Sequence, residues 1–141
     1  MTEWTARAAV DVPAPIARVW TALTDPALIA QYMDGTRVET DWQVGSPIAW
    51  RGEIGGRGYT DSGVVLVHDE PTRLSVTHAS PLAAPPGAPE PVHTLEWTLS
   101  ESGGTTRLEL TQDGCADAEQ AEAFSANWQR YLDGLARVAT G

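Results

Sequence analysis

The amino-acid sequence predicts an α+β fold, in which a curved, seven-stranded antiparallel sheet wraps around one long C-terminal helix. Three observations predict it. Apolar residues near the C-terminus recur with a helical period, the middle of the chain alternates with the period of a strand, and two short helical patterns lie between the first and second strands. A sheet with one apolar face must be covered, and only the last segment is long and apolar enough to cover it. We therefore expect a single domain over residues 1–141.

The first predicted elements are a strand and two short helices. Alternation over residues 4–12 predicts a half-buried strand whose inward face is formed by Trp4, Ala6, Ala8, Val10 and Val12. Pro13 and Pro15 end this strand, and the apolar spacing that follows predicts a helix beginning at Ile16. Asp25 and Pro26 end that helix and begin a second one over residues 27–33.

Six further strands are predicted from runs of period two that are separated by turn residues, near residues 36–42, 47–54, 58–68, 72–79, 91–100 and 104–113. The glycine-rich run at 52–58 is similar to a phosphate-binding loop, but no helix follows it, so we expect a hairpin with bulges. Residues 80–90 contain four prolines, which predict a stiff extended loop instead of a strand.

The last predicted element is an amphipathic helix over residues 117–140. Asp117 and Gln120 have the spacing of a capping box, and Gly141 closes the far end. With Phe124 as origin and 100° per residue, one arc of roughly 120° contains the apolar residues Trp128, Tyr131, Leu132, Leu135, Val138 and Ala139. This face is expected to be buried against the sheet.

Composition narrows the classes of partner. The chain has 19 acidic residues and 9 basic ones, a net charge of -10, so the phosphates of a nucleic acid would be repelled. The single Cys115 cannot form an internal disulfide, and the sequence has neither a signal-peptide pattern nor an apolar run near 18 residues. We expect a cytoplasmic protein that does not insert into membranes and uses no cofactor.

Several segments together resemble a known superfamily. They are IARVWTALTDPALIAQYM (16–33), GVVLVHDEPTRLSVTH (63–78), HTLEWTL (93–99), GGTTRLELTQDG (103–114) and NWQRYLDGLARV (127–138). The chain is similar to the SRPBCC, or START-like, superfamily, which includes Bet v 1-like proteins, and within it to the bacterial proteins grouped with the Hsp90 ATPase activator homologues, the AHSA1-like subgroup. The resemblance implies a helix-grip fold with a cavity between the sheet and the C-terminal helix.

The resemblance leaves three functions open. The first is non-enzymatic binding of a small hydrophobic or amphipathic molecule, such as a lipid, in that cavity. The second is a polyketide cyclase or aromatase that uses the same pocket, and the third is a protein-binding module of the Hsp90-activator kind. A protein partner or a homodimer is compatible with all three, and the fold alone does not choose among them.

Aromatic residues are the first candidates for the site. The inward phase of residues 91–100 places Trp97 under the C-terminal helix, opposite Trp128 and Tyr131, and Trp50 shares the inward phase of its own strand. Core packing and a ligand-binding wall both account for such residues. The predicted walls are Trp50, Trp97, Phe124, Trp128 and Tyr131, with Tyr32 and the proline-rich loop at the entrance.

Two histidines are the candidate polar anchors. His78 and His93 share the inward phase of their strands, so a hairpin that closes over residues 80–91 sets them opposite each other. They would form a polar patch in an apolar pocket or a proton relay, unless they are partly hydrated residues at the strand ends. His68, His78 and His93 have no compact ligand spacing, so no metal site is expected, and no catalytic residue is assigned.

Overall fold

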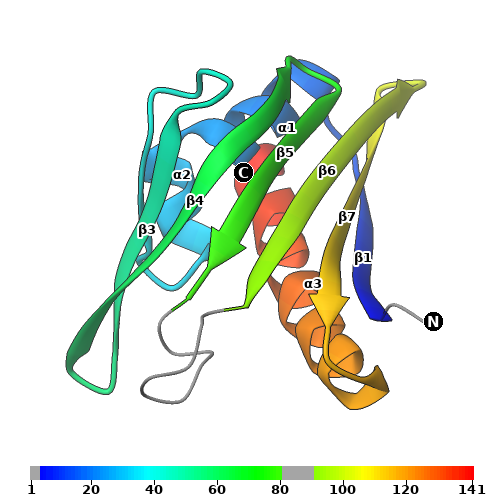
Figure 1. Ribbon diagram of the computed structural model, residues 1–141. Coiled ribbons are helices and arrows are strands. Elements are labelled where there is room, and N and C mark those ends of the chain that lie inside the picture. The colour runs from blue at the N-terminus through cyan, green and yellow to red at the C-terminus, as the bar shows by residue number, and fades with distance from the viewer. Residues whose placement is uncertain (1–3, 81–90) are drawn as a thin grey trace.

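The predicted architecture is confirmed by the computed structural model, which describes residues 4–80 and 91–141 (Figure 1). Seven antiparallel strands form one sheet in the order β1-β7-β6-β5-β4-β3-β2. The sheet curves around one side of a long helix, and each strand is hydrogen-bonded to its neighbours in this order. The strands are β1 (Trp4–Val12), β2 (Arg37–Glu39), β3 (Pro47–Ile54), β4 (Arg57–Asp69), β5 (Arg73–Ala79), β6 (Val92–Ser102) and β7 (Thr105–Cys115).

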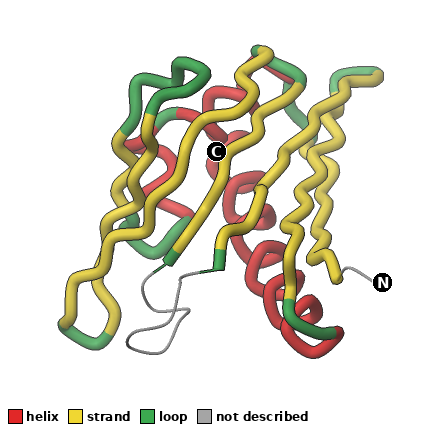
Figure 2. Tube along the Cα trace, in the orientation of Figure 1, coloured by secondary structure: helices red, strands yellow, loops and turns green. Residues whose placement is uncertain are grey.

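Three helices lie on the concave side of the sheet (Figures 1 and 2). They are α1 (Ile16–Thr24), α2 (Pro26–Tyr32) and α3 (Ala118–Thr140). The Asp117 carboxylate accepts the backbone N–H of Gln120 at 2.8 Å, which confirms the predicted cap of α3. A Cβ atom added at Gly134 of α3 would lie 2.8 Å from Cβ of Tyr32, so α2 and α3 pack in close contact there.

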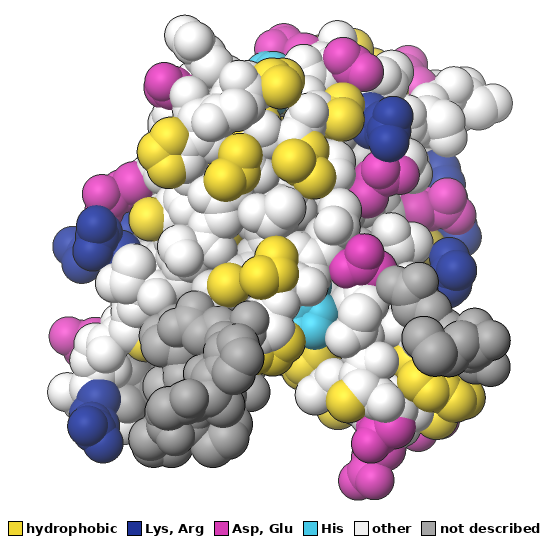
Figure 3. All heavy atoms as spheres, in the orientation of Figure 1, with side chains coloured by type: hydrophobic (Ala, Val, Ile, Leu, Met, Phe, Trp, Pro, Cys, Tyr) yellow, Lys and Arg dark blue, Asp and Glu magenta, His cyan; other side chains and the backbone are white. Residues whose placement is uncertain are grey.

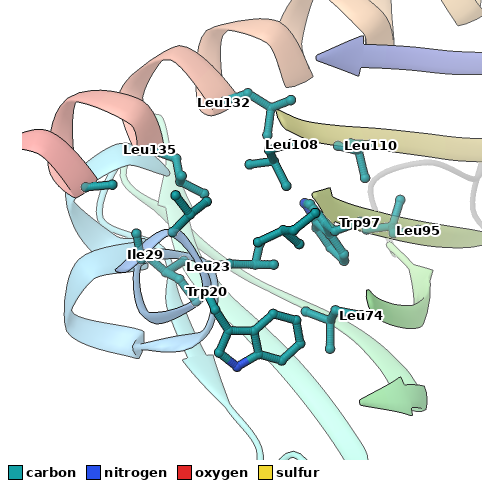
Figure 4. Close-up of a cluster of buried hydrophobic side chains, with 14 of the residues drawn as sticks. Trp20, Leu23, Ile29, Leu74, Leu95, Trp97, Leu108, Leu110, Leu132 and Leu135 are labelled. Carbon is teal, nitrogen blue, oxygen red and sulfur yellow. The ribbon is translucent and has the colours of Figure 1, made fainter. Parts of the chain in front are cut away.

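The hydrophobic core fills the space between the sheet and the C-terminal half of α3 (Figure 4). Leu132 and Leu135 point from α3 toward leucines of the sheet, and α1 and α2 close one end with Trp20, Leu23 and Ile29. Burial of a side chain of this size stabilises the fold by about 1.5–3 kcal/mol. The leucines that are at most 2 % exposed are Leu74, Leu95, Leu108, Leu110, Leu132 and Leu135.

Three local predictions were wrong, and one lies outside the described residues. Trp4 is 41 % exposed at the first position of β1, where the pairing with β7 shifts register between Trp4 and Ala6. The strand predicted at 36–42 covers only Arg37–Glu39, and Trp42 has a positive φ of 63°. The β3–β4 hairpin has no bulge, because Gly55 and Gly56 form a two-residue turn with positive φ and the pairing is continuous. The proline-rich loop falls mostly within residues 81–90, which the structure does not describe.

Candidate functional site

A cavity of about 530 Å³ lies between the N-terminal half of α3 and the sheet. Every strand from β3 to β7 contributes to its walls, and Met33 and Thr36 add to them after α2. Its size is within the range of about 300–1,000 Å³ that small-molecule sites occupy. Figure 3 shows the corresponding hollow at the lower edge of the molecule, with a histidine side chain above it.

A second, much smaller cavity of about 30 Å³ adjoins the first, on the side of α1 and α2. It is lined almost entirely by apolar and aromatic side chains, among them Leu23, Ile29 and Leu135. A space of this size holds about one water molecule. The interior is therefore packed at the C-terminal half of α3 and open at its N-terminal half.

Most of the predicted site residues line the larger cavity. These are Trp50, His78, His93, Phe124, Trp128 and Tyr131. Tyr32 and Trp97 instead line the small cavity. The Tyr32 hydroxyl donates a hydrogen bond to the carbonyl oxygen of Ala22 at 3.0 Å, and burial raises its pKa well above the ordinary value for tyrosine. Tyr32 therefore joins α2 to α1 and does not lie on the wall of the larger cavity.

Trp128 lies at the boundary of the two cavities and lines both, as do Met33, Trp50 and Tyr131. Its Nε1–H donates to Oε1 of Gln112 at 2.6 Å, and Gln112 is itself only 5 % exposed. Trp97 and Tyr131 contact the ring edge to face, at centroid distances of 6.1 and 5.7 Å. Such contacts hold an aromatic wall in one orientation.

The main polar group of the cavity wall is a pair formed by Asp61 and His78. Nε2 of His78 lies 2.9 Å from Oδ2 of Asp61, and the two side chains are 22 % and 14 % exposed. The ring of Trp50 contacts the imidazole edge to face at 4.9 Å. Among the residues that the structure describes, neither Oδ1 of Asp61 nor Nδ1 of His78 has a hydrogen-bond partner, although both atoms are buried. Leaving a buried polar atom without a hydrogen bond costs about 1–3 kcal/mol. A group that formed a hydrogen bond with either atom would remove this cost.

His93 is the register partner of His78, as predicted, but its ring has different contacts. Its Nδ1 donates a hydrogen bond to the carbonyl oxygen of Asp113 at 2.7 Å, because a carbonyl oxygen can only accept. The neutral ring therefore carries its proton on Nδ1 and presents Nε2 as an acceptor. Phe124 contacts the ring edge to face at 6.0 Å. The two histidines are neighbours on the wall, each held by its own partner.

An exposed ion pair stands beside Tyr131, at the edge of the cavity. Arg130 binds the Asp34 carboxylate through both terminal nitrogens, at 3.2 and 3.0 Å, and the Tyr131 hydroxyl donates to the same carboxylate at 3.3 Å. The hydrogen bond from Arg130 lowers the pKa of Asp34, whereas burial raises the pKa of Tyr131. Both charged side chains are more than half exposed, so the pair contributes little to stability.

Sequence reasoning missed Asp61 and Gln112. Asp61 shares the inward phase of Tyr59 and Val65 in β4 and is the register partner of Trp50. An acidic residue at an inward position of a strand was the signal that could have identified it. Gln112 has the same signal in β7, where it alternates with Leu108 and Leu110.

Neither a metal site nor a membrane-spanning helix is found among the described residues. Within residues 4–80 and 91–141, no three histidine, cysteine or acidic side chains are placed to hold a metal ion. No helix in these ranges is long and apolar enough to cross a membrane.

Comparison with known proteins identifies the family. Residues 13–140 match the family described as activator of Hsp90 ATPase homolog 1-like protein. The chain belongs to this family. The match spans both short helices, strands β2–β7 and all of α3, so it includes every described residue that lines the cavity. No curated protein sequence matches the chain.

Solved structures of similar proteins share the fold. A protein from Cytophaga hutchinsonii, ChR145, is 37 % identical, with a TM-score of 0.84 over 97 % of this chain and 94 % of that one. DynU16, from the dynemicin biosynthetic locus, is 25 % identical, with a TM-score of 0.76 over 96 % of this chain and 47 % of that one. CalU16 from Micromonospora echinospora is 23 % identical, with a TM-score of 0.74 over 98 % of this chain and 85 % of that one. The AHSA1-like chain is thus a helix-grip domain of the SRPBCC superfamily.

Proposed function

We propose that this AHSA1-like protein binds one small amphipathic molecule in the larger cavity. The cavity of about 530 Å³ carries the proposal, because it is large enough for a small molecule, whereas the adjoining cavity of about 30 Å³ holds about one water molecule. Trp50, Phe124 and Trp128 supply apolar walls, and His78 and His93 supply polar anchors at one side. Apolar walls with a few convergent polar groups are typical of ligand-binding sites.

The comparison with DynU16 supports a small-molecule ligand, since that protein comes from a biosynthetic locus. The ligand would lie along the N-terminal half of α3, with its apolar part against Trp128 and its polar part toward β5 and β6. In this arrangement Trp97 and Tyr32 support the wall from behind and do not contact the ligand.

Native mass spectrometry of the freshly purified protein, followed by organic extraction, tests this function. We expect one retained molecule per chain with a mass of roughly 150–600 Da, which suits a cavity of this size. A clean mass of the chain alone, together with no thermal shift in a screen of apolar compounds, would contradict the proposal. The thermal-shift screen is needed because weak ligands are lost in purification.

A further inference from the structure

The charged groups around the larger cavity are unevenly distributed. Asp61 is the one acidic residue among the described residues that line it, and none of these lining residues is an arginine. The chain has no lysine, and its net charge is -10. Arg130, which lies beside Tyr131 on α3, is already bound by Asp34. No lysine or arginine is therefore placed on the described part of the wall to bind an anionic ligand, and the Asp61 carboxylate repels such a ligand across a wall of low polarity.

The unpaired atoms of the Asp61–His78 pair are both acceptors when the imidazole is neutral. The Asp61 carboxylate can only accept, so the bond of 2.9 Å places the proton of His78 on Nε2. Nδ1 of His78 then carries a lone pair, and Oδ1 of Asp61 carries another. His93 adds a third acceptor at Nε2, since its Nδ1–H is bound to Asp113. These groups require a ligand that donates hydrogen bonds.

We infer that the cavity selects uncharged molecules with a hydrogen-bond donor, such as a hydroxyl or an amide, and rejects carboxylates, and that Asp61 is the residue that determines this selectivity. The inference rests on the proposed binding function and specifies its ligand class. It excludes ionised fatty acids as ligands, although their chains would suit the apolar walls. A hydroxyl group that reaches Oδ1 of Asp61 or Nδ1 of His78, after a small rotation of either side chain, would pair an acceptor that is buried and unpaired without it.

Three probes with one ring system test the inference by calorimetric titration near neutral pH. They are 2-naphthol, which donates a hydrogen bond, 2-methoxynaphthalene, which is uncharged and does not, and 2-naphthoate, which is an anion. We expect 2-naphthol to bind about tenfold more tightly than either of the others, since a hydrogen bond to a charged group has an effect of this size. This comparison needs no variant and so does not depend on folding of a mutant.

The variant Asp61→Asn then assigns the effect to one residue. We expect the preference for 2-naphthol over 2-naphthoate to fall to about threefold or less, since the negative charge is gone while the shape is kept. Glu122→Gln is the matched control, because Glu122 is exposed and lies on the side of α3 opposite Gln120 and Phe124, which line the cavity. It changes the net charge equally and should leave the preference unchanged.

Two results would overturn the inference while leaving the binding function intact: equal affinities for the three probes in the wild-type protein, or an unchanged preference in folded Asp61→Asn. If none of the probes binds the wild-type protein, the binding function fails and the inference fails with it. Circular dichroism of both variants establishes that they are folded.

Discussion

The indole Nε1–H of Trp128 donates a hydrogen bond of 2.6 Å to the side chain of Gln112, and this bond joins α3 to β7 at the boundary between packed core and open cavity. On one side of it lie the leucines of the C-terminal half of α3. On the other side lie Phe124, His93 and the Asp61–His78 pair. The same bond thus stabilises the fold and fixes one wall of the site.

A double-mutant cycle measures this bond. Gln112→Leu leaves the indole N–H of Trp128 without its acceptor, and Trp128→Phe leaves the Gln112 amide without its donor. We expect a coupling free energy of about 1 kcal/mol, obtained from urea unfolding of both single variants and the double variant. Gln31→Leu on the exposed face of α2 is the control for the loss of an amide. Strictly additive changes in the free energy of unfolding would show that the bond does not couple the two residues.

Gly63 is required where β4 passes close to β5. A Cβ atom at this position would overlap the backbone carbonyl of Thr77, and a backbone atom cannot rotate away. We expect Gly63→Ala to lower the free energy of unfolding by about 3 kcal/mol, at the upper end of the range for overpacking. In Gly58→Ala, on the same strand, the new Cβ would lie 3.9 Å from its nearest neighbour, so that variant should be nearly neutral. Equal stability of the two variants in urea would refute this description of the sheet.

The buried hydroxyl of Tyr32 predicts a dependence of stability on alkaline pH. Burial raises its pKa in the folded state, so its contribution is full below the ordinary tyrosine pKa of about 10 and is lost as the pH rises further. The free energy of unfolding should therefore fall less steeply above about pH 10 in Tyr32→Phe than in the wild-type protein. Urea unfolding at about pH 9 and pH 11 measures the difference. Parallel losses in the two proteins would indicate that Tyr32 titrates normally.

Much of the fold could be predicted from the sequence because its signals are local. Alternation over residues 4–12 gives the observed bounds of β1, and the cap at Asp117 marks the start of α3. The opposition of His78 and His93 was predictable as well, because the segment between them joins two adjacent strands and their inward phases fix the register. Local periodicity therefore located both the elements and one pair of residues in the site.

The rest of the site depends on contacts between distant segments. The pairing of His78 with Asp61 requires the register of β4 against β5, which shifts between Val65 and Val67. Whether Trp97 contacts a ligand or the core depends on where the ring of Trp128 lies, and the 6.1 Å contact between the two rings places Trp97 behind the wall. Periodicity gives the face on which a side chain lies, but not the volume left open beside it.

The most direct test of the central claim, that the larger cavity binds a small molecule, is a titration with N-phenyl-1-naphthylamine. This uncharged dye carries an N–H donor and becomes fluorescent in apolar surroundings. The variant Asn127→Trp places a large ring at the cavity lining, and Ala126→Trp places the same ring at the adjacent exposed position of α3, which does not line the cavity. We predict saturable binding of one dye per chain in the wild-type protein and in Ala126→Trp, weakened about tenfold or more in Asn127→Trp. Absence of binding in the wild-type protein, or equal affinity in the two variants, would contradict the account.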